Sequence, residues 1–356
     1  MIDSIRSHAD TAIMDPEATA PALLGWYDRH ARALPWRAPP GSPPGTAPAD
    51  PYRVWLSEVM LQQTTVAAVR ERFIRFTSRW PDIAALAAAP EAEIMGEWAG
   101  LGYYARARNL VACARMVAEA GGFPETREGL ARLPGIGAYT SAAIAAIAFG
   151  KAETVIDANV ERVVARLFAV ETALPASRRE IAGLAEQLTP QHRPGDFAQA
   201  MMDLGSMICT PRAPSCDRCP LAHLCRAHAT GRAAELPRRA PKTPKPRREG
   251  AAWVLFDDRG RVLLERRPKR GLLGGMLAFP STGWDGSDHP PPLDTDWRDA
   301  GSVRHVFTHF QLDLAVRTGE ARGNPARGEW HDRAALDPRS LPSLMRKVWA
   351  AVSPDP

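Results

Sequence analysis

The stretch LPGIGAYTS, from Leu133 to Ser141, places two glycines two residues apart and a tyrosine two residues later, ahead of the small-residue run AAIAAIAFG. Gly135 and Gly137 can adopt backbone conformations closed to other residues, and they let another molecule approach the main chain. The following helix is expected to begin near Tyr139, so its unpaired N–H groups and positive dipole end face the same space. This arrangement suits a phosphate. A helix–helix turn that uses glycine for geometry alone is the alternative.

Two further motifs contain carboxylates at helix starts. In VIDANVERV, Asp157 precedes a good helical pattern, so a helix cap is its simplest role and a functional role can coexist with it. In DPYRVWLSEVMLQQT, Asp50 and Pro51 form a helix start, and Glu58 follows among apolar residues. Desolvation there would raise the pKa of Glu58, as a general acid needs near neutral pH. The alternative for Glu58 is an exposed helix glutamate.

Four of the five cysteines are clustered in CTPRAPSCDRCPLAHLC, whereas Cys113 stands apart and is expected as a small core residue. The clustered residues are Cys209, Cys216, Cys219 and Cys225. In a reducing cytoplasm a metal explains them better than disulfides do. Only one C-x-x-C pair is present, so the spacing favours an iron-sulfur cluster but leaves zinc open.

The length of the chain and a change in its predicted secondary structure indicate two domains. At 356 residues the chain exceeds the size, roughly 250 to 300 residues, at which a single core stops growing. Helical patterns precede residue 236, whereas AAWVLFDDRGRVLLERR and SVRHVFTHFQLDLAVRTGE look like strands. Between them, PRRAPKTPKPRR at 237–248 has six basic residues and no acidic one, which exceeds the whole net charge of +5. Its four prolines predict an extended linker, either a solvated spacer or a segment lying along phosphates.

The expected divisions are a tail at 1–20, an all-α domain at 21–235, a linker at 236–250 and an α/β or α+β domain at 251–356. The proline-rich stretch at 38–51 is expected to be a surface loop. The N-terminus lacks the apolar core of a signal peptide, and no stretch is long and apolar enough to span a bilayer. These features predict a cytoplasmic protein with no membrane association.

Five motifs together resemble one family. They are SEVMLQQT, WAGLGYYARARNL, LPGIGAYTSAAI, VIDANVERV and the four-cysteine cluster. Their combination closely resembles the MutY-type adenine DNA glycosylases of the helix-hairpin-helix superfamily, strongly over residues 21–235 and more loosely beyond. The resemblance implies a two-lobed all-α glycosylase domain with a 4Fe-4S cluster on the four cysteines. It also implies that the hairpin Leu133 to Gly137 grips the backbone of double-stranded DNA containing A:8-oxoguanine or A:G mispairs. The implied protein is a monomer on the bacterial nucleoid.

The resemblance also assigns the chemistry. Glu58 is implied to protonate adenine, at N7, and Asp157 to stabilise or transiently capture the sugar cation. Tyr139 and Asn159 are implied to position these groups. In endonuclease III-like relatives a lysine stands where this chain has Tyr139, and its amine forms a Schiff base that leads to strand cleavage. Tyrosine cannot do this, so a monofunctional enzyme that leaves an abasic site is implied.

Base extrusion and recognition are assigned in the same way. A duplex hides its bases, so the target nucleotide must be flipped out. Gln63 and Tyr103 match the family positions that enter the helix stack. Arg37 in LPWR and Asp203 in AMMDLGSM are implied to recognise the flipped adenine, and Trp36 to pack on it. Some relatives carry glutamate at the position of Asp203, so its reach here is shorter.

Residues 251–356 resemble the α+β, Nudix-related domain with which MutY-type enzymes read 8-oxoguanine. GLLGGMLAFP matches the Nudix-like opening, but the RE-x-x-E-E carboxylates of Nudix hydrolases are absent from the sequence, so pyrophosphate hydrolysis is not expected. The Phe-Ser-His loop of the family corresponds to Phe307, Thr308 and His309, in which threonine keeps the hydroxyl and adds a methyl group. A plain strand pair is the alternative for this stretch.

Two other functions are compatible with part of the sequence. A bifunctional glycosylase and lyase for oxidised pyrimidines is disfavoured by Tyr139 and by the C-terminal domain. A non-catalytic iron-sulfur protein that binds DNA or senses redox state is disfavoured by Glu58 and Asp157 in their motifs.

Overall fold

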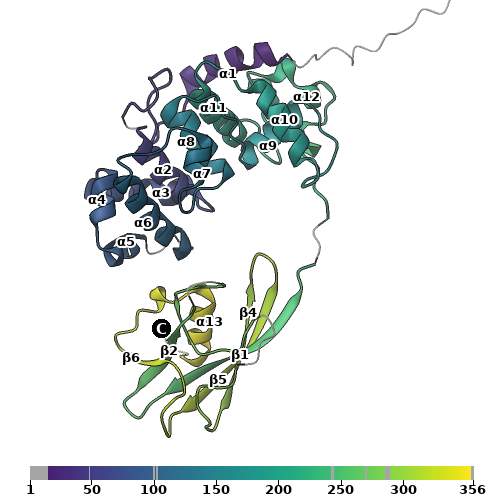
Figure 1. The fold of residues 1–356 in the computed structure, drawn as a ribbon. Helices are drawn as coiled ribbons and strands as arrows, with labels where there is room; N and C mark the ends of the chain where they lie inside the picture. Colours follow the sequence, from purple (N-terminus) through teal and green to yellow (C-terminus); the bar gives the residue numbers. More distant parts are fainter. Residues whose placement is uncertain are drawn as a thin grey trace, which may run out of the picture. The chain divides into compact units, whose positions relative to one another are not determined.

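The computed structural model describes residues 15–353 except 48, 99–100, 102, 242–243, 269–270 and 285–288. The chain divides into two compact units, Met1–Pro241 and Lys242–Pro356, the first helical and the second built on a sheet (Figure 1). Within the described part of the chain, no helix combines the length and apolarity needed to cross a membrane.

The first unit is a series of helices joined by short loops. Its longer helices are α1 (Pro16–His30), α2 (Pro51–Leu61), α3 (Val66–Arg79), α4 (Ile83–Ala88), α5 (Glu91–Trp98), α6 (Tyr104–Glu119), α7 (Arg127–Ala131), α8 (Ala138–Phe149), α9 (Ala158–Leu167), α10 (Arg178–Leu188) and α11 (Pro194–Met207). Short elements follow around the cysteines: η2 (Cys216–Arg218), η3 (Ala222–Leu224), α12 (Arg226–Ala229) and η4 (Ala233–Glu235). Helix α1 begins inside the segment expected as an N-terminal tail.

Local sequence signals set the helix starts that matter for the site. Asp50 caps α2 by accepting a hydrogen bond from the Arg53 amide, and Pro51 is its first residue. The Asp157 side chain caps α9 by accepting from the amides of Asn159 and Val160. Both starts agree with the sequence-based expectation.

Helix α8 is shared by two hydrophobic cores. Its residues Ala142, Ala143 and Ala146 pack with α1 and α9–α11, whereas Ile144 and Ala145 pack with α2–α7. Small side chains on every face let helices approach from all sides, which explains the composition of AAIAAIAFG. The first unit therefore has two lobes that meet at α8, and Figure 1 shows α8 between the two groups of helices.

The glycine hairpin lies between α7 and α8. Leu133 and Ile136 are buried in the second of these cores and anchor it. Gly135 has a φ of +77°, and a Cβ there would lie 2.8 Å from the Cβ of Asn109, so glycine is required. Gly137 differs from our expectation because its φ of −97° is open to any residue. A Cβ on Gly137 would meet nothing within 4 Å, so its contribution is an open approach to the main chain.

The second unit is a mixed sheet with one helix against it. The strands are β1 (Arg247–Phe256), β2 (Arg261–Arg266), β3 (Leu277–Ala278), β4 (Arg298–Val306), β5 (Gln311–Glu320) and β6 (Glu329–Asp332), in the order β3-β2-β1-β5-β4 with β6 paired to β2. Strands β1 and β5 are parallel, and β4 and β5 form an antiparallel hairpin. Helix α13 (Ser343–Val352) buries Leu344, Met345 and Val348 in the core of this unit.

The segment expected as a linker is partly structured. Arg238 and Ala240 exchange backbone hydrogen bonds with Leu174 at 2.8 and 2.9 Å, within the first unit. At the other end, Arg247 to Gly250 belong to β1. These pairings depend on partners far away in the sequence, which the local proline and arginine content does not show.

Candidate active site

A cavity of about 800 Å³ is lined by residues from both lobes of the first unit. Many of the residues singled out in the sequence line it: Trp36, Arg37, Glu58, Gln63, Gly135, Gly137, Tyr139, Asp157 and Asn159. Leu133, Tyr103 and Asp203 are not among its lining residues. The fold therefore gathers residues from α2, the glycine hairpin, α8 and the start of α9 around one space.

Glu58 projects from α2 and is only 8% exposed. Burial raises the pKa of Glu58 to about 7, whereas a hydrogen bond from the Tyr139 hydroxyl and the charge of Arg37 act in the opposite direction. Asp157 raises it further by repulsion between like charges. A carboxyl group with this pKa carries a proton in a large share of molecules near neutral pH, so it can act as a general acid.

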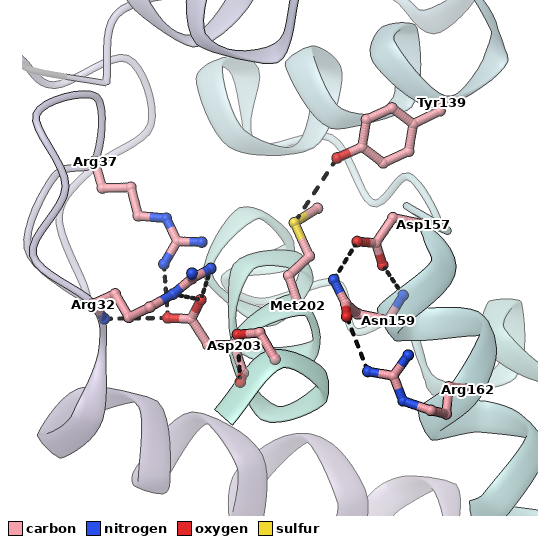
Figure 2. Close-up of polar contacts among 9 residues, drawn as sticks. Arg32, Arg37, Tyr139, Asp157, Asn159, Arg162, Met202 and Asp203 are labelled. Atoms are coloured by element: carbon pink, nitrogen blue, oxygen red, sulfur yellow. Dashed lines mark hydrogen bonds and ion pairs between the residues drawn. The ribbon is translucent and has the colours of Figure 1, made fainter. Parts of the chain in front are cut away.

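Asp157 lies at the N-terminus of α9 and is held by three donors, and Figure 2 shows those that belong to Asn159. Its carboxylate accepts hydrogen bonds from the amide of Asn159 at 2.8 Å, the amide of Val160 at 2.7 Å and the Asn159 side-chain Nδ2 at 2.7 Å. The Asn159 Oδ1 in turn accepts from Arg162 Nη2 at 3.0 Å. The helix cap and these contacts fix the orientation of an anion at the cavity wall.

The Tyr139 hydroxyl lies among charged groups of the cavity. Burial raises its pKa well above the usual value, and the nearby carboxylates of Glu58 and Asp157 act in the same direction. The phenol is therefore a neutral hydrogen-bond donor at physiological pH. It also contacts the sulfur of Met202 at 3.9 Å (Figure 2).

Asp203 lies behind the cavity wall, paired with two arginines (Figure 2). Its side chain has no exposure; one oxygen is 2.7 Å from Arg37 Nη1, and the other is 2.6 Å from the Arg32 guanidinium. The Arg32 backbone amide also donates to it at 3.1 Å. Both oxygens of Asp203 are engaged by arginines and its side chain does not line the cavity, so we expect it to act on the base through Arg37. Asp203 holds Arg37, which does line the cavity.

Trp36 is both a core residue and a cavity residue. It is buried, packs edge-on against Phe73 with ring centroids 5.2 Å apart, and lines the cavity. Burial in the core and a place on the cavity wall are therefore compatible for Trp36.

Gln63 and Tyr103 share an unusual backbone conformation. Their φ angles are +57° and +49°, in the left-handed region that residues other than glycine rarely adopt. Gln63 lies in the turn after α2, and Tyr103 lies just before α6 with 61% of its surface exposed. Backbone strain of this kind concentrates at functional sites.

The four clustered cysteines pack against the first core, beside α9 and α11. Burial raises the pKa of the Cys219 thiol to about 12, and the neighbouring cysteines raise it further. These thiols would stay protonated in the absence of a nearby positive charge. A bound cationic metal group would favour their thiolate forms. Among the described residues, no group of three or more Cys, His, Asp or Glu side chains is arranged to hold a single metal ion.

Two arginines of α9 contact this segment, and sequence reasoning missed both. Arg162 donates to the Cys209 carbonyl at 2.7 Å and also contacts Asn159. Arg166, which is 1% exposed, donates to Cys209 Sγ at 3.1 Å and to the Leu236 carbonyl at 2.8 Å. The available signal was the Arg pair at i, i+4 in NVERVVARL, which places both arginines on one face of a helix beside valines, where a buried arginine needs polar partners.

Helices α9 and α11 pack closely where Asn159 and Arg162 lie. A Cβ on Gly205 of α11 would lie 2.6 Å from the Cβ of Asn159, so the absence of a side chain lets α11 approach the start of α9. Arg162 Nη2 then reaches the Gly205 carbonyl at 2.6 Å.

In the second unit, Phe307, Thr308 and His309 lie in the turn between β4 and β5. The Phe307 amide donates to the Phe310 carbonyl at 2.8 Å, which closes the turn. The Phe307 ring is half-buried and stacks on Phe310 with centroids 4.8 Å apart, whereas Thr308 and His309 are exposed. The stretch that looked like one strand run in the sequence is thus a hairpin that presents Thr308 and His309 to solvent.

Comparison with known proteins identifies related families for three segments. Residues 56–191 match the HhH-GPD superfamily of base excision DNA repair proteins, residues 209–225 the iron-sulfur binding domain of endonuclease III, and residues 251–351 the NUDIX domain. The second match assigns the cysteines to an iron-sulfur cluster, which resolves the choice that spacing left open.

Relatives that match most of this chain are adenine DNA glycosylases. The adenine DNA glycosylase of Homo sapiens is 35% identical over 92% of this chain and 72% of its own length. That of Rattus norvegicus is 36% identical over 87% of this chain and 72% of its own. The solved structure of a thermostable thymine-DNA glycosylase is 29% identical and has a TM-score of 0.53, covering 60% of this chain and 97% of that one.

Proposed function

Because the chain belongs to the adenine DNA glycosylase family, we propose that it removes adenine paired with 8-oxoguanine or guanine by hydrolysis and leaves the strand uncut. Excision of adenine from DNA in base-excision repair is the activity of its relatives and of this chain. The opposing base, the absence of lyase activity and the residue roles below are our proposals. The separation of the chain into a glycosylase domain and a lesion-reading domain joined by a basic linker is part of the same proposal.

One observation carries the chemistry: a buried carboxyl group with a pKa of about 7 lines the same cavity as the fixed carboxylate of Asp157. Cleavage of an N-glycosidic bond passes through a state with cationic character on the sugar. It needs a proton for the departing base and an anion beside the sugar. Glu58 and Asp157 provide this pair because their surroundings differ: the first is desolvated, and the second is held by donors.

The proposed reaction proceeds as follows. Glu58 donates its proton to N7 of adenine while the bond between C1′ and N9 breaks and its electrons stay with the base. The carboxylate of Asp157 stabilises or transiently captures the sugar cation. Water then adds to C1′ and loses a proton to the Glu58 carboxylate, which restores the acid, and the products are adenine and an abasic site. Asn159 holds Asp157, and the Tyr139 hydroxyl holds Glu58.

The flipped base would contact Trp36 and Arg37 in the cavity. Asp203 acts through Arg37, since the ion pair directs one nitrogen of the guanidinium to Asp203 and leaves the others for the cavity. Breaking a buried ion pair leaves an uncompensated charge, so the pair keeps Arg37 in place.

Tyr139 supports a monofunctional reaction. It lines the cavity beside Asp157 and offers a hydroxyl of very high pKa instead of an amine. Formation of a Schiff base requires a nucleophilic amine. Among the residues that the structure describes, those lining the cavity include no lysine.

We assign DNA contacts to the surfaces around the cavity. The hairpin Leu133 to Gly137 and the N-terminus of α8 would bind backbone phosphate, and Gln63 and Tyr103 would enter the base stack. Phe307, Thr308 and His309 would read 8-oxoguanine, which rests on the family resemblance and on the exposure of Thr308 and His309.

The four cysteines hold a 4Fe-4S cluster, and Arg166 donates to one of its sulfur ligands. The cluster would fix the segment 209–225 against α9 and α11. All residues assigned to the reaction come from one chain, so we propose that a monomer suffices and that it works in the cytoplasm on chromosomal DNA.

Substitution of each carboxylate tests the roles. Glu58→Gln and Asp157→Asn should each slow adenine release by about 10²- to 10⁴-fold, because both keep shape and remove acid or charge. Binding to a lesion duplex, measured by fluorescence anisotropy, should change little. The matched control is Glu93→Gln, since Glu93 of α5 forms an exposed ion pair with Arg79 of α3. It should alter neither adenine release nor DNA binding. Loss of binding in proportion to loss of catalysis would show that the carboxylates are structural.

A further inference from the structure

Arg106 of α6 reaches the C-terminal end of α2, the helix that carries Glu58. Its Nη1 donates to the Val59 carbonyl at 3.1 Å and to the Gln62 carbonyl. The last carbonyls of a helix have no partner within it, and a cation there also interacts favourably with the helix dipole. Arg106 therefore caps α2 and holds the residue that directly precedes Gln63.

The same guanidinium reaches the segment before α6. Its Nη2 donates to the Leu101 carbonyl at 3.2 Å. Its carbon lies 5.4 Å from the centroid of the Tyr103 ring and 5.5 Å from that of Trp98, within the range of cation–π attraction. One side chain thus contacts the turn that contains Gln63 and the ring of Tyr103.

The half-buried charge of Arg106 is not explained by an ion pair. Desolvation lowers its pKa, so placing the charge here has a free-energy cost. Among the described residues, the guanidinium of Arg106 contacts backbone carbonyls and aromatic rings, and no carboxylate is among these partners. A structural ion pair does not account for its position. What its partners share is proximity to Gln63 and Tyr103, two of the non-glycine residues with a left-handed backbone.

We propose that Arg106 is a positioning residue that fixes Gln63 and Tyr103 relative to each other, so that the two enter the base stack as one wedge when adenine leaves the duplex. This inference rests on the wedge role assigned to both residues above. Strained backbones persist only where their surroundings hold them. The planar fork of arginine presents donors in two directions at once, which a single ammonium group cannot do.

The test compares two DNA duplexes under single-turnover conditions with saturating enzyme. In the first, the target adenine lies opposite guanine; in the second, it lies opposite a tetrahydrofuran abasic analogue, so less pairing and stacking must be broken. Arg106→Met should slow excision from the first by about 10- to 100-fold, as misplacement of a positioning group does. Excision from the second should change little. Arg106→Lys should resemble Arg106→Met.

The matched control is Arg72→Met. Arg72 is also half-buried and donates to a backbone carbonyl, that of Glu97, at 3.0 Å in the same lobe, without contacting Gln63 or Tyr103. It should leave both rates unchanged. The visible absorbance of the cluster and the thermal unfolding midpoint verify that each variant is folded.

A double-mutant cycle and a pH profile separate positioning from general damage. If Arg106 acts through the wedge, Arg106→Met should add no slowing to a Gln63→Ala/Tyr103→Ala enzyme. The alkaline limb of the rate profile, which reports Glu58, should stay in place. Equal slowing on both duplexes, full slowing in the double-alanine enzyme, or a shifted limb would overturn the inference and indicate that Arg106 acts through α2.

The two proposals fail in different ways. If the Gln63→Ala/Tyr103→Ala enzyme excises from the first duplex as fast as the wild type, the wedge assignment fails and the inference fails with it. If that enzyme is slow but Arg106→Met is as fast as the wild type, only the role of Arg106 is overturned.

Discussion

The Nη1 of Arg37 lies 2.7 Å from the Oδ2 of Asp203, and the two side chains are 7% and 0% exposed. An acid outside the cavity thus neutralises the arginine that lines it. Because Arg37 lowers the pKa of Glu58, this ion pair limits how far the arginine can favour ionisation of Glu58. The electrostatics of the cavity therefore extend to a residue behind its wall.

Asp203→Asn should shift the pH dependence of excision. Arg37 would keep its charge without its partner, so it would favour the anion of Glu58 more strongly, and the alkaline limb should move to lower pH. Breaking the buried pair should also lower the free energy of unfolding by about 3 to 5 kcal/mol. Asp196→Asn, on the same helix in a partly exposed pair with Arg193, is the control. An Asp203→Asn enzyme that is folded and whose limb does not move would contradict the coupling.

Glu58 should make the folded protein less stable as pH rises. Its folded pKa of about 7 lies above the ordinary value of 4.5, so between these values the unfolded chain releases a proton that the folded chain retains. Stability is lost across this window and stays lower above it. Glu58→Gln should therefore raise the free energy of unfolding at pH 8 by up to roughly 3 kcal/mol and much less at pH 5.5. Equal effects at both pH values, measured by urea unfolding, would mean that Glu58 ionises normally.

The purified protein should be brown and contain about four iron atoms per chain, the composition that a 4Fe-4S cluster requires. Metal analysis after anaerobic purification measures this directly. Stoichiometric zinc without iron would contradict the assignment of Cys209, Cys216, Cys219 and Cys225.

Sequence reasoning was most successful where the signal is local. The Asp50–Pro51 start of α2 and the Asp157 cap of α9 depend on neighbouring residues, and the structure confirms both. The cysteine spacing is likewise local, and the match to the iron-sulfur binding domain of endonuclease III confirms the cluster. The hairpin glycines were only half explained, because Gly135 needs its positive φ whereas Gly137 does not.

Features set by distant partners could not be predicted from the sequence. The burial of Asp203 depends on Arg32 and Arg37, which are more than 160 positions away in the chain. The burial of Arg162 and Arg166 likewise depends on the segment around Cys209, which accepts hydrogen bonds from both. Long-range packing, which leaves no periodic trace in a single sequence, decides all of these.

Tyr139→Lys should give the enzyme the nucleophile of a lyase. The new amine would face the sugar carbon beside Asp157, and burial together with the N-terminus of α8 should lower its pKa and favour the neutral form. Borohydride should then trap a covalent adduct with substrate DNA, even if excision slows. The wild type should trap poorly. No adduct from a folded variant that still excises adenine would show that Tyr139 does not occupy the position of the nucleophile.

The central claim is that this enzyme removes adenine and leaves the strand intact. The most direct measurement is single-turnover treatment of a duplex containing adenine opposite 8-oxoguanine, with product analysed before and after alkali. The account predicts an intact strand before alkali and complete cleavage at the target adenine after it. A strand broken without alkali would indicate a glycosylase with lyase activity, and a strand intact even after alkali would indicate a protein that binds DNA without excising adenine; either result would contradict the account.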